Sequence, residues 1–142
     1  MSYDVYTIKK ERNVVLPTWL DTLIFEDLSA SYCRQNRDMV VLDWNFDDIK
    51  KYLGTYFPRS YAESFCIFSN FFSKEKYVYE NCQELSVFDF GCGTGGELIG
   101  FIIAVTKQLP NIKKITIRAL DGNLYALRCL ECILEKTAKV LC

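Results

Sequence analysis

The sequence contains no histidine among its 142 residues. This absence removes the commonest general base near neutral pH, and it excludes Ser-His-Asp and Cys-His catalysis within this chain. Long apolar runs are also absent, because the longest, residues 98–105, falls far short of the ~20 residues that cross a bilayer. The formal net charge is only −1, so the sequence predicts no strong non-specific attraction to nucleic acid or to an anionic membrane.

Cysteine, by contrast, occurs seven times, in an odd and scattered set. Thiols among mostly apolar neighbours are typical of a reduced, cytoplasmic protein, and the N-terminus has no pattern of a secretory signal. Cys129 and Cys132 have the spacing of a metal or redox motif, but they fall within a helical pattern, and no second pair or histidine accompanies them. We therefore expect neither a metal site nor a thioredoxin-type site here.

The most informative stretch is residues 86–96, Ser-Val-Phe-Asp-Phe-Gly-Cys-Gly-Thr-Gly-Gly. Strand-forming residues come first, four glycines follow, and an apolar, helix-like segment begins at once. A strand, a glycine-rich turn and a helix in this order form a cradle, because the helix N-terminus points free N–H groups at a ligand over the loop. An ordinary strand–helix turn is the alternative, but four glycines cost more conformational entropy than such a turn requires.

Asp89 bears on the ligand that this cradle would take. The spacing Gly91-x-Gly93-x-x-Gly96 satisfies the dinucleotide fingerprint, which leaves NAD and FAD open. A carboxylate at the end of the strand would oppose a pyrophosphate but attract an ammonium or a sulfonium, since unit charges about 4 Å apart interact by ~4 kcal/mol at an effective dielectric constant of about 20. S-adenosylmethionine carries both of these positive charges and no phosphate.

Residues 89–95, Asp-Phe-Gly-Cys-Gly-Thr-Gly, resemble the first motif of the Rossmann-like (class I) S-adenosylmethionine-dependent methyltransferases. A second similarity is residues 114–121, which read as a strand ending in Asp121. The resemblance covers about residues 86–136 and implies that Asp121 accepts hydrogen bonds from the ribose hydroxyls, whereas a solvated strand-end acid is the alternative for Asp121 alone. It also implies that the loop glycines contact the methionine part. The expected cofactor-binding residues are Asp89, Gly91, Cys92, Gly93, Thr94, Gly95, Asp121 and Gly122, and no catalytic residue is assigned.

The expected fold is α/β, a partial Rossmann-like methyltransferase fold preceded by an α-helical N-terminal region. Parallel strands over residues 86–91 and 114–121 are flanked by helices over residues 96–109 and 123–136. Residues 86–142 form the S-adenosylmethionine-binding unit in this interpretation, and residues 1–85 form an aromatic-rich lid or cap.

Within the first 85 residues the apolar spacing predicts several helices. One runs from Pro17 to about Gln35, and the next is capped by Asn45 and broken at Gly54 and Pro58. A third runs from Tyr61 to about Ser73, opened by a capping box at Ser60 and Glu63. Residues 40–42 suit an edge strand or a linker. The loop expected over residues 56–61 would carry tyrosines to the cofactor, although packing in the core is the plainer explanation for the many aromatic residues.

Two parallel strands make a poor sheet, so we expect an exposed apolar edge or patch. Further sequence, a homodimer or a partner protein would cover it. The resembled family has more strands and a catalytic motif that this chain does not show. Three hypotheses follow: the cofactor-binding portion of a methyltransferase, a non-catalytic regulatory module that keeps the cofactor pocket, or an interaction protein without cofactor. The methyl acceptor stays open among RNA, protein and small molecule.

Overall fold

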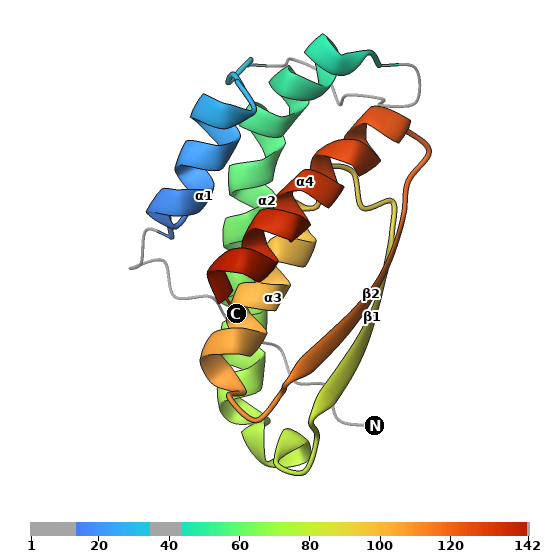
Figure 1. Ribbon diagram of the computed structural model, residues 1–142. Coiled ribbons are helices and arrows are strands. Elements are labelled where there is room, and N and C mark those ends of the chain that lie inside the picture. The colour runs from blue at the N-terminus through green and yellow to red at the C-terminus, as the bar shows by residue number, and fades with distance from the viewer. Residues whose placement is uncertain (1–13, 35–43, 142) are drawn as a thin grey trace, which may run out of the picture.

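A computed structural model describes residues 14–34 and 44–141 of the chain. These ranges contain the helices α1 (Thr18–Thr22), α2 (Phe46–Lys74), α3 (Gly96–Gln108) and α4 (Leu124–Leu141), and the strands β1 (Glu84–Phe90) and β2 (Lys114–Leu120). A π-helical turn, η1 (Leu23–Asp27), extends α1, and a 3-10 turn, η2 (Lys76–Tyr79), follows α2. The fold is therefore mixed α/β, with the helices gathered on one side of the two strands (Figure 1).

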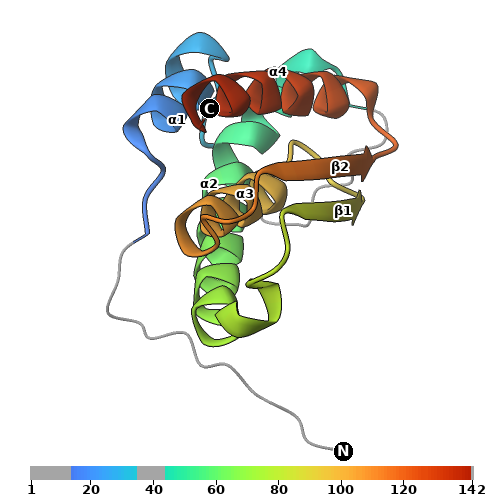
Figure 2. The same ribbon diagram turned by 60° about the horizontal axis from the view of Figure 1, so that its bottom comes forward.

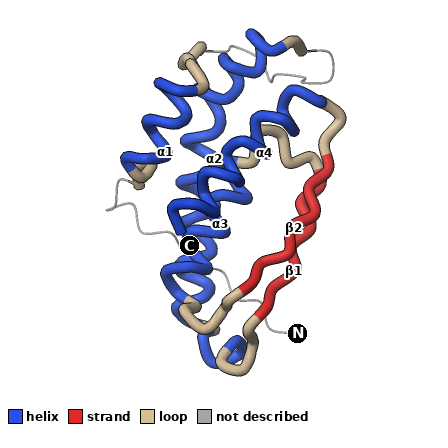
Figure 3. The backbone as a smooth tube through the Cα atoms, in the orientation of Figure 1, coloured by secondary structure: helices blue, strands red, loops and turns tan. Residues whose placement is uncertain are grey.

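The two strands pair in parallel, and Val87 lies opposite Ile117 in the register. This confirms the predicted parallel pairing, although β1 begins two residues earlier than expected and both strands end one residue earlier. Side chains alternate between the two faces of a strand, and along β1 Leu85, Val87 and Asp89 are partly buried while the residues between them are exposed. One face of the sheet thus packs on the helices, and no helix of the described ranges covers the opposite face (Figures 1 and 3).

Helix α2 is a single helix of 29 residues that continues through Gly54 and Pro58. The predicted break at these two residues, the separate helix opened by Ser60 and Glu63, and the loop over residues 56–61 are therefore wrong. A proline inside a helix costs about 3 kcal/mol, but burial of the α2 side chains on both sides of it, such as Leu53 and Tyr61, offsets this cost. Tertiary packing has overridden the local signal.

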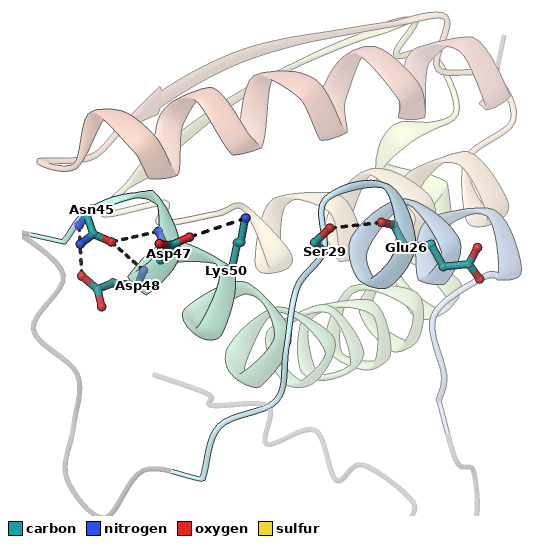
Figure 4. Close-up of polar contacts among 6 residues, drawn as sticks. All are labelled: Glu26, Ser29, Asn45, Asp47, Asp48 and Lys50. Atoms are coloured by element: carbon teal, nitrogen blue, oxygen red, sulfur yellow. Dashed lines mark hydrogen bonds and ion pairs between the residues drawn. The ribbon is translucent and has the colours of Figure 1, made fainter.

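The start of α2 agrees with the prediction. Oδ1 of Asn45 accepts hydrogen bonds from the N–H groups of Asp47 (2.9 Å) and Asp48 (3.0 Å), and a carboxylate oxygen of Asp48 accepts one from the Asn45 N–H (3.2 Å; Figure 4). This capping box satisfies N–H groups that have no partner within the helix. An ion pair of 3.6 Å between Lys50 and Asp47 lies on the same turn.

The first helical segment is shorter than expected. It ends at Asp27, with Leu28 as its C-cap, and Ser29 takes a left-handed conformation with φ of 53°, where its hydroxyl donates a hydrogen bond to the Glu26 carbonyl at 3.5 Å (Figure 4). A left-handed residue ends a helix, so the predicted helix is wrong over residues 28–34, and its expected end at Gln35 lies outside the described residues. Residues 40–42, for which an edge strand or a linker was considered, lie outside the described residues.

Helices α2 and α3 pack closely through small residues. A Cβ at Gly100 would lie 2.5 Å from the Tyr61 carbonyl oxygen, and one at Gly96 would lie 2.8 Å from the Phe57 carbonyl oxygen. Leu20, Phe57, Ile99 and Ile133 belong to one buried cluster, so all four helices share a core. Figure 2 shows α2 and α3 side by side, with α4 running over the sheet beside them. Over the described ranges, no helix has the length and apolarity needed to cross a membrane.

Candidate functional site

The loop between β1 and α3 is the centre of the candidate site. The N–H groups of Gly91 and Cys92 donate to the Leu120 carbonyl at 2.7 and 3.1 Å, so the loop folds back over the end of β2. Gly91, Gly93 and Gly95 all have positive φ, at 75°, 52° and 84°, a conformation that side chains with a Cβ rarely adopt. The sequence therefore needs glycine at these three positions for the turn itself.

The glycines differ in their surroundings. A Cβ at Gly91 would meet nothing within 4 Å, whereas one at Gly93 would lie 2.9 Å from the Tyr52 hydroxyl. A Cβ at Gly95 would collide with Leu130 of α4, and Gly96 packs on the backbone of α2. Of the loop's four glycines, Gly91 alone faces open space, and the others allow close packing. Of these four positions, Gly91 leaves the most room beside the backbone for an approaching ligand.

The Asp121 carboxylate, which follows β2, forms hydrogen bonds with the glycine loop and with the residue before α4. Its Oδ2 accepts a hydrogen bond of 2.8 Å from the Gly93 N–H, and its Oδ1 accepts one of 2.8 Å from the Asn123 N–H. Asn123 in turn caps α4, because its Oδ1 accepts from the Ala126 N–H at 3.0 Å. Asp121 therefore has a structural role that the sequence interpretation missed. Each carboxylate oxygen can accept a further hydrogen bond, so contact with a ribose hydroxyl remains open to it.

Three carboxylates surround the loop: Asp89 at the end of β1, Asp121 after β2 and Glu97 in the first turn of α3. Burial raises the pKa of Asp89, and the negative charges of Glu97 and Asp121 raise this pKa further. Within the described residues, neither Asp89 nor Glu97 forms an ion pair or a side-chain hydrogen bond. The site thus concentrates negative charge that a positively charged ligand would stabilise.

Aromatic side chains of α2 form the wall opposite the loop. Tyr52 stacks on Tyr56 with ring centroids 5.0 Å apart, and Trp44 meets Tyr52 edge-on at 5.6 Å. Burial raises the pKa of the Tyr52 hydroxyl, and the charge of Asp121 is the next cause. The segment predicted to approach the loop lies beside it, but as part of the helix α2 and not as a loop.

Between this wall and the loop lies a cavity of about 90 Å³, which Tyr52, Tyr56, Cys92 and Thr94 help to line. Sites for small molecules are usually about 300–1,000 Å³, so the cavity would enclose only part of a cofactor. The remainder would extend over Gly91, where the space is open.

Cys92 is half-buried in this site, and burial followed by the charges of Asp89 and Asp121 raises the pKa of its thiol to about 11. A thiol with this pKa stays protonated at neutral pH, so Cys92 is no ready nucleophile.

The structure brings the predicted residues to one place at the carboxyl ends of the strands. Thr94 is buried and Gly122 is exposed next to Asp121. Sequence reasoning missed Glu97, Tyr52 and Asn123. The sequence does contain a signal for Glu97, since an acid directly after the glycines falls in the first turn of the helix. Tyr52 lies 37 positions before Asp89, so only the tertiary fold shows that it belongs to the site. Among the described residues, no group of three or more metal-binding side chains is placed to hold a metal ion.

No family model, curated protein or solved structure matches this chain.

Proposed function

We propose that this chain binds S-adenosylmethionine over the loop at residues 91–96, as the cofactor-binding portion of a partial Rossmann-like methyltransferase. The observation that carries the proposal is the acidic rim, by which we mean the side chains of Asp89 and Glu97 beside the loop. Asp89 and Glu97 have no cationic partner in the described residues, and Asp89 is partly buried beside two like charges. A dinucleotide would bring its phosphates to the same carboxylates, so the rim disfavours NAD and FAD.

Each part of the site suits one part of that cofactor. Asp89 and Glu97 supply negative charge for the sulfonium and ammonium groups, Asp121 has spare acceptor capacity for a ribose hydroxyl, and Gly91 lets the backbone approach closely. The ring faces of Tyr52 and Tyr56 would attract a cation by ~0.5–2 kcal/mol. Bound there, S-adenosylmethionine would supply an activated methyl group.

The chain's own contribution to such a transfer is binding and orientation. Rigid presentation of a reactive group to an acceptor is a large part of many rate enhancements, and a loop braced by Asp121 and α3 is a rigid support. The acceptor remains open among RNA, protein and small molecule.

The second candidate is a non-catalytic interaction or regulatory protein that keeps the old fold. One observation favours it: on the face of the sheet opposite the helices Phe88 is 65% exposed and Phe90 is 78% exposed, as expected for an uncovered apolar surface. Exposed apolar patches of this kind commonly mark interaction sites.

Titration calorimetry with S-adenosylmethionine, S-adenosylhomocysteine and NAD tests the proposal. We expect saturable binding of the two adenosyl compounds, no binding of NAD, and weaker binding of S-adenosylmethionine by Asp89→Asn and Glu97→Gln. Glu131→Gln, on the exposed side of α4, is the matched control and keeps the wild-type affinity. No heat and no thermal shift with millimolar S-adenosylmethionine or S-adenosylhomocysteine would exclude cofactor binding and favour the interaction protein.

A further inference from the structure

A second and larger cavity, of about 370 Å³, runs beside the outer edge of β1. Its apolar walls include Val87 of β1, Leu98 and Phe101 of α3, and Ile67 of α2, which is 48% exposed. The groove follows the strand rather than the glycine loop, and it shares only Glu97 with the smaller cavity. The cofactor proposal uses Asp89 and Glu97 at one end of this groove, but not the apolar part that follows β1.

The edge of β1 along this groove has no partner strand in the described part of the chain, because the sheet consists of β1 and β2 alone. The Gly91 N–H faces β2, where it bonds to Leu120. Backbone groups alternate in direction along a strand, so those of Ser86, Phe88 and Phe90 point to the open edge. A row of free donors and acceptors beside an apolar groove is the arrangement to which an extended peptide adds as a further strand.

The two ends of the groove differ in charge. Glu63, Asp89 and Glu97 line it, and none of its lining residues is basic. The Ser64 hydroxyl donates a hydrogen bond of 2.6 Å to the Glu97 carbonyl, which brings the turn of α2 that carries Glu63 beside the start of α3. The acids therefore gather near the carboxyl end of β1, while Phe68 and Phe101 make the other part apolar.

This charge distribution also argues against a second copy of the chain. Two copies related by a twofold axis would pair β1 with β1 in antiparallel orientation. Glu84 begins the strand, where it forms a 3.2 Å ion pair with Lys114, and Asp89 lies near the other end, so each copy would bring an already neutralised pair toward the acidic end of its partner. A partner with an unpaired basic end complements the acids better than such a pair does.

We propose that the open edge of β1 and its groove bind an extended peptide segment that alternates β-branched or aromatic residues and carries lysine or arginine at the end near Asp89. The backbone of the segment pairs with Ser86 and Phe88, its apolar side chains enter the groove at Ile67 and Phe101, and its basic end meets the three carboxylates.

A displayed library of random decapeptides, selected against the full chain, provides the test. We expect enrichment of proline-free alternating sequences with a basic end, and a synthetic peptide of that sequence that binds more weakly in high salt. No enrichment, or enrichment of acidic or proline-rich sequences, overturns the proposal. Self-association through this edge in sedimentation experiments, blocked by Ile67→Asp, would assign the edge to a second copy and overturn it too.

Three variants locate the bound peptide. Ser86→Pro removes an outward N–H, which a proline on an edge strand permits, and we expect a loss of about tenfold in peptide affinity, whereas Ser86→Ala keeps the N–H and the affinity. Ile67→Asp, at an exposed position, should abolish peptide binding with S-adenosylmethionine binding unchanged. Wild-type peptide affinity in folded Ile67→Asp contradicts the proposal. Because cofactor binding is measured separately, failure of either proposal is distinguishable from failure of the other.

Discussion

The Gly93 amide donates a 2.8 Å hydrogen bond to Oδ2 of Asp121, which lies 28 residues further along the chain. This bond fixes the loop after β1 against the end of β2, and the second oxygen of the same carboxylate holds the Asn123 N–H at the start of α4. A group proposed to bind ribose thus also supports the fold around it. Stability and cofactor binding therefore have to be measured separately at this position.

Asp121→Ala is expected to lower the free energy of unfolding by ~1.5–3 kcal/mol, because two backbone N–H groups lose a charged acceptor. Urea denaturation followed by circular dichroism gives this value. Glu131→Ala, an exposed position on α4, should change it by less than about 0.5 kcal/mol. Equal stability of Asp121→Ala and wild type would show that the bracing role assigned to this carboxylate is wrong.

Asp89 should make the protein less stable as the pH rises. Burial and neighbouring acids raise its pKa above 3.8 in the folded state, so the folded protein holds the proton more tightly than the unfolded chain. Stability from this group is complete below the unfolded pKa and falls as the pH rises through the folded value. Asp89→Asn should therefore be more stable than wild type at pH 7, with the gain shrinking toward pH 3. Denaturation curves across this range that stay parallel for the two proteins would contradict the effect.

Gly100→Ala should destabilise the contact between α2 and α3. The added Cβ would lie 2.5 Å from the Tyr61 carbonyl oxygen and 2.9 Å from the Phe65 nitrogen, both backbone atoms that move only with their helix. Overpacking of this kind costs about 1–3 kcal/mol, which exceeds the gain of about 1 kcal/mol from replacing a helical glycine. Thermal unfolding of Gly100→Ala, compared with Ala138→Gly at an exposed position of α4, separates the two effects. A raised melting temperature for Gly100→Ala would show that the helices are not in close contact.

The thiols should differ in reactivity according to burial. Burial raises the pKa of Cys129 to about 12, and burial is also the main cause that raises the pKa of Cys92 to about 11. Cys132 lies exposed three positions after Cys129 on α4. With iodoacetamide at pH 8, peptide mass mapping should find that, among the six thiols of the described residues, Cys132 is labelled first and Cys129 last, and denaturant should remove the difference. Equal labelling of Cys129 and Cys132 in the native protein would contradict the packing of α4.

The second half of the fold was predictable because its signals are local. Alternating apolar residues mark β1, glycines mark the turn at residues 91–96, and the apolar segment after them marks α3, so these elements agree with the structure within about two residues. The last helix, predicted over residues 123–136, instead runs on to Leu141. The first half of the fold was not predictable in this way, because the local sequence at Gly54 and Pro58 indicates a break in the helix. Gly54 instead allows close approach to Ser31, where a Cβ would lie 2.5 Å from the backbone, and no local pattern reports such a contact.

The candidate site shows the same division. The positions of Asp89, Gly91 and Asp121 follow from a strand, a turn and a strand end, and the parallel pairing brings them together. The hydrogen bonds of Asp121 and the close approach of Tyr52 to Gly93 are set by tertiary packing. The sequence therefore predicted where these residues meet, whereas the narrowness of the enclosed cavity became evident only in three dimensions.

The most direct test of the cofactor proposal is a titration of ¹⁵N-labelled protein with S-adenosylmethionine, followed through the backbone amide signals. The account predicts saturable shifts that are largest at Gly91, Gly93 and Gly95, with signals from the far end of α4, such as Lys139, unchanged. Loop amides that do not shift at millimolar cofactor, or shifts confined to another part of the chain, would contradict it.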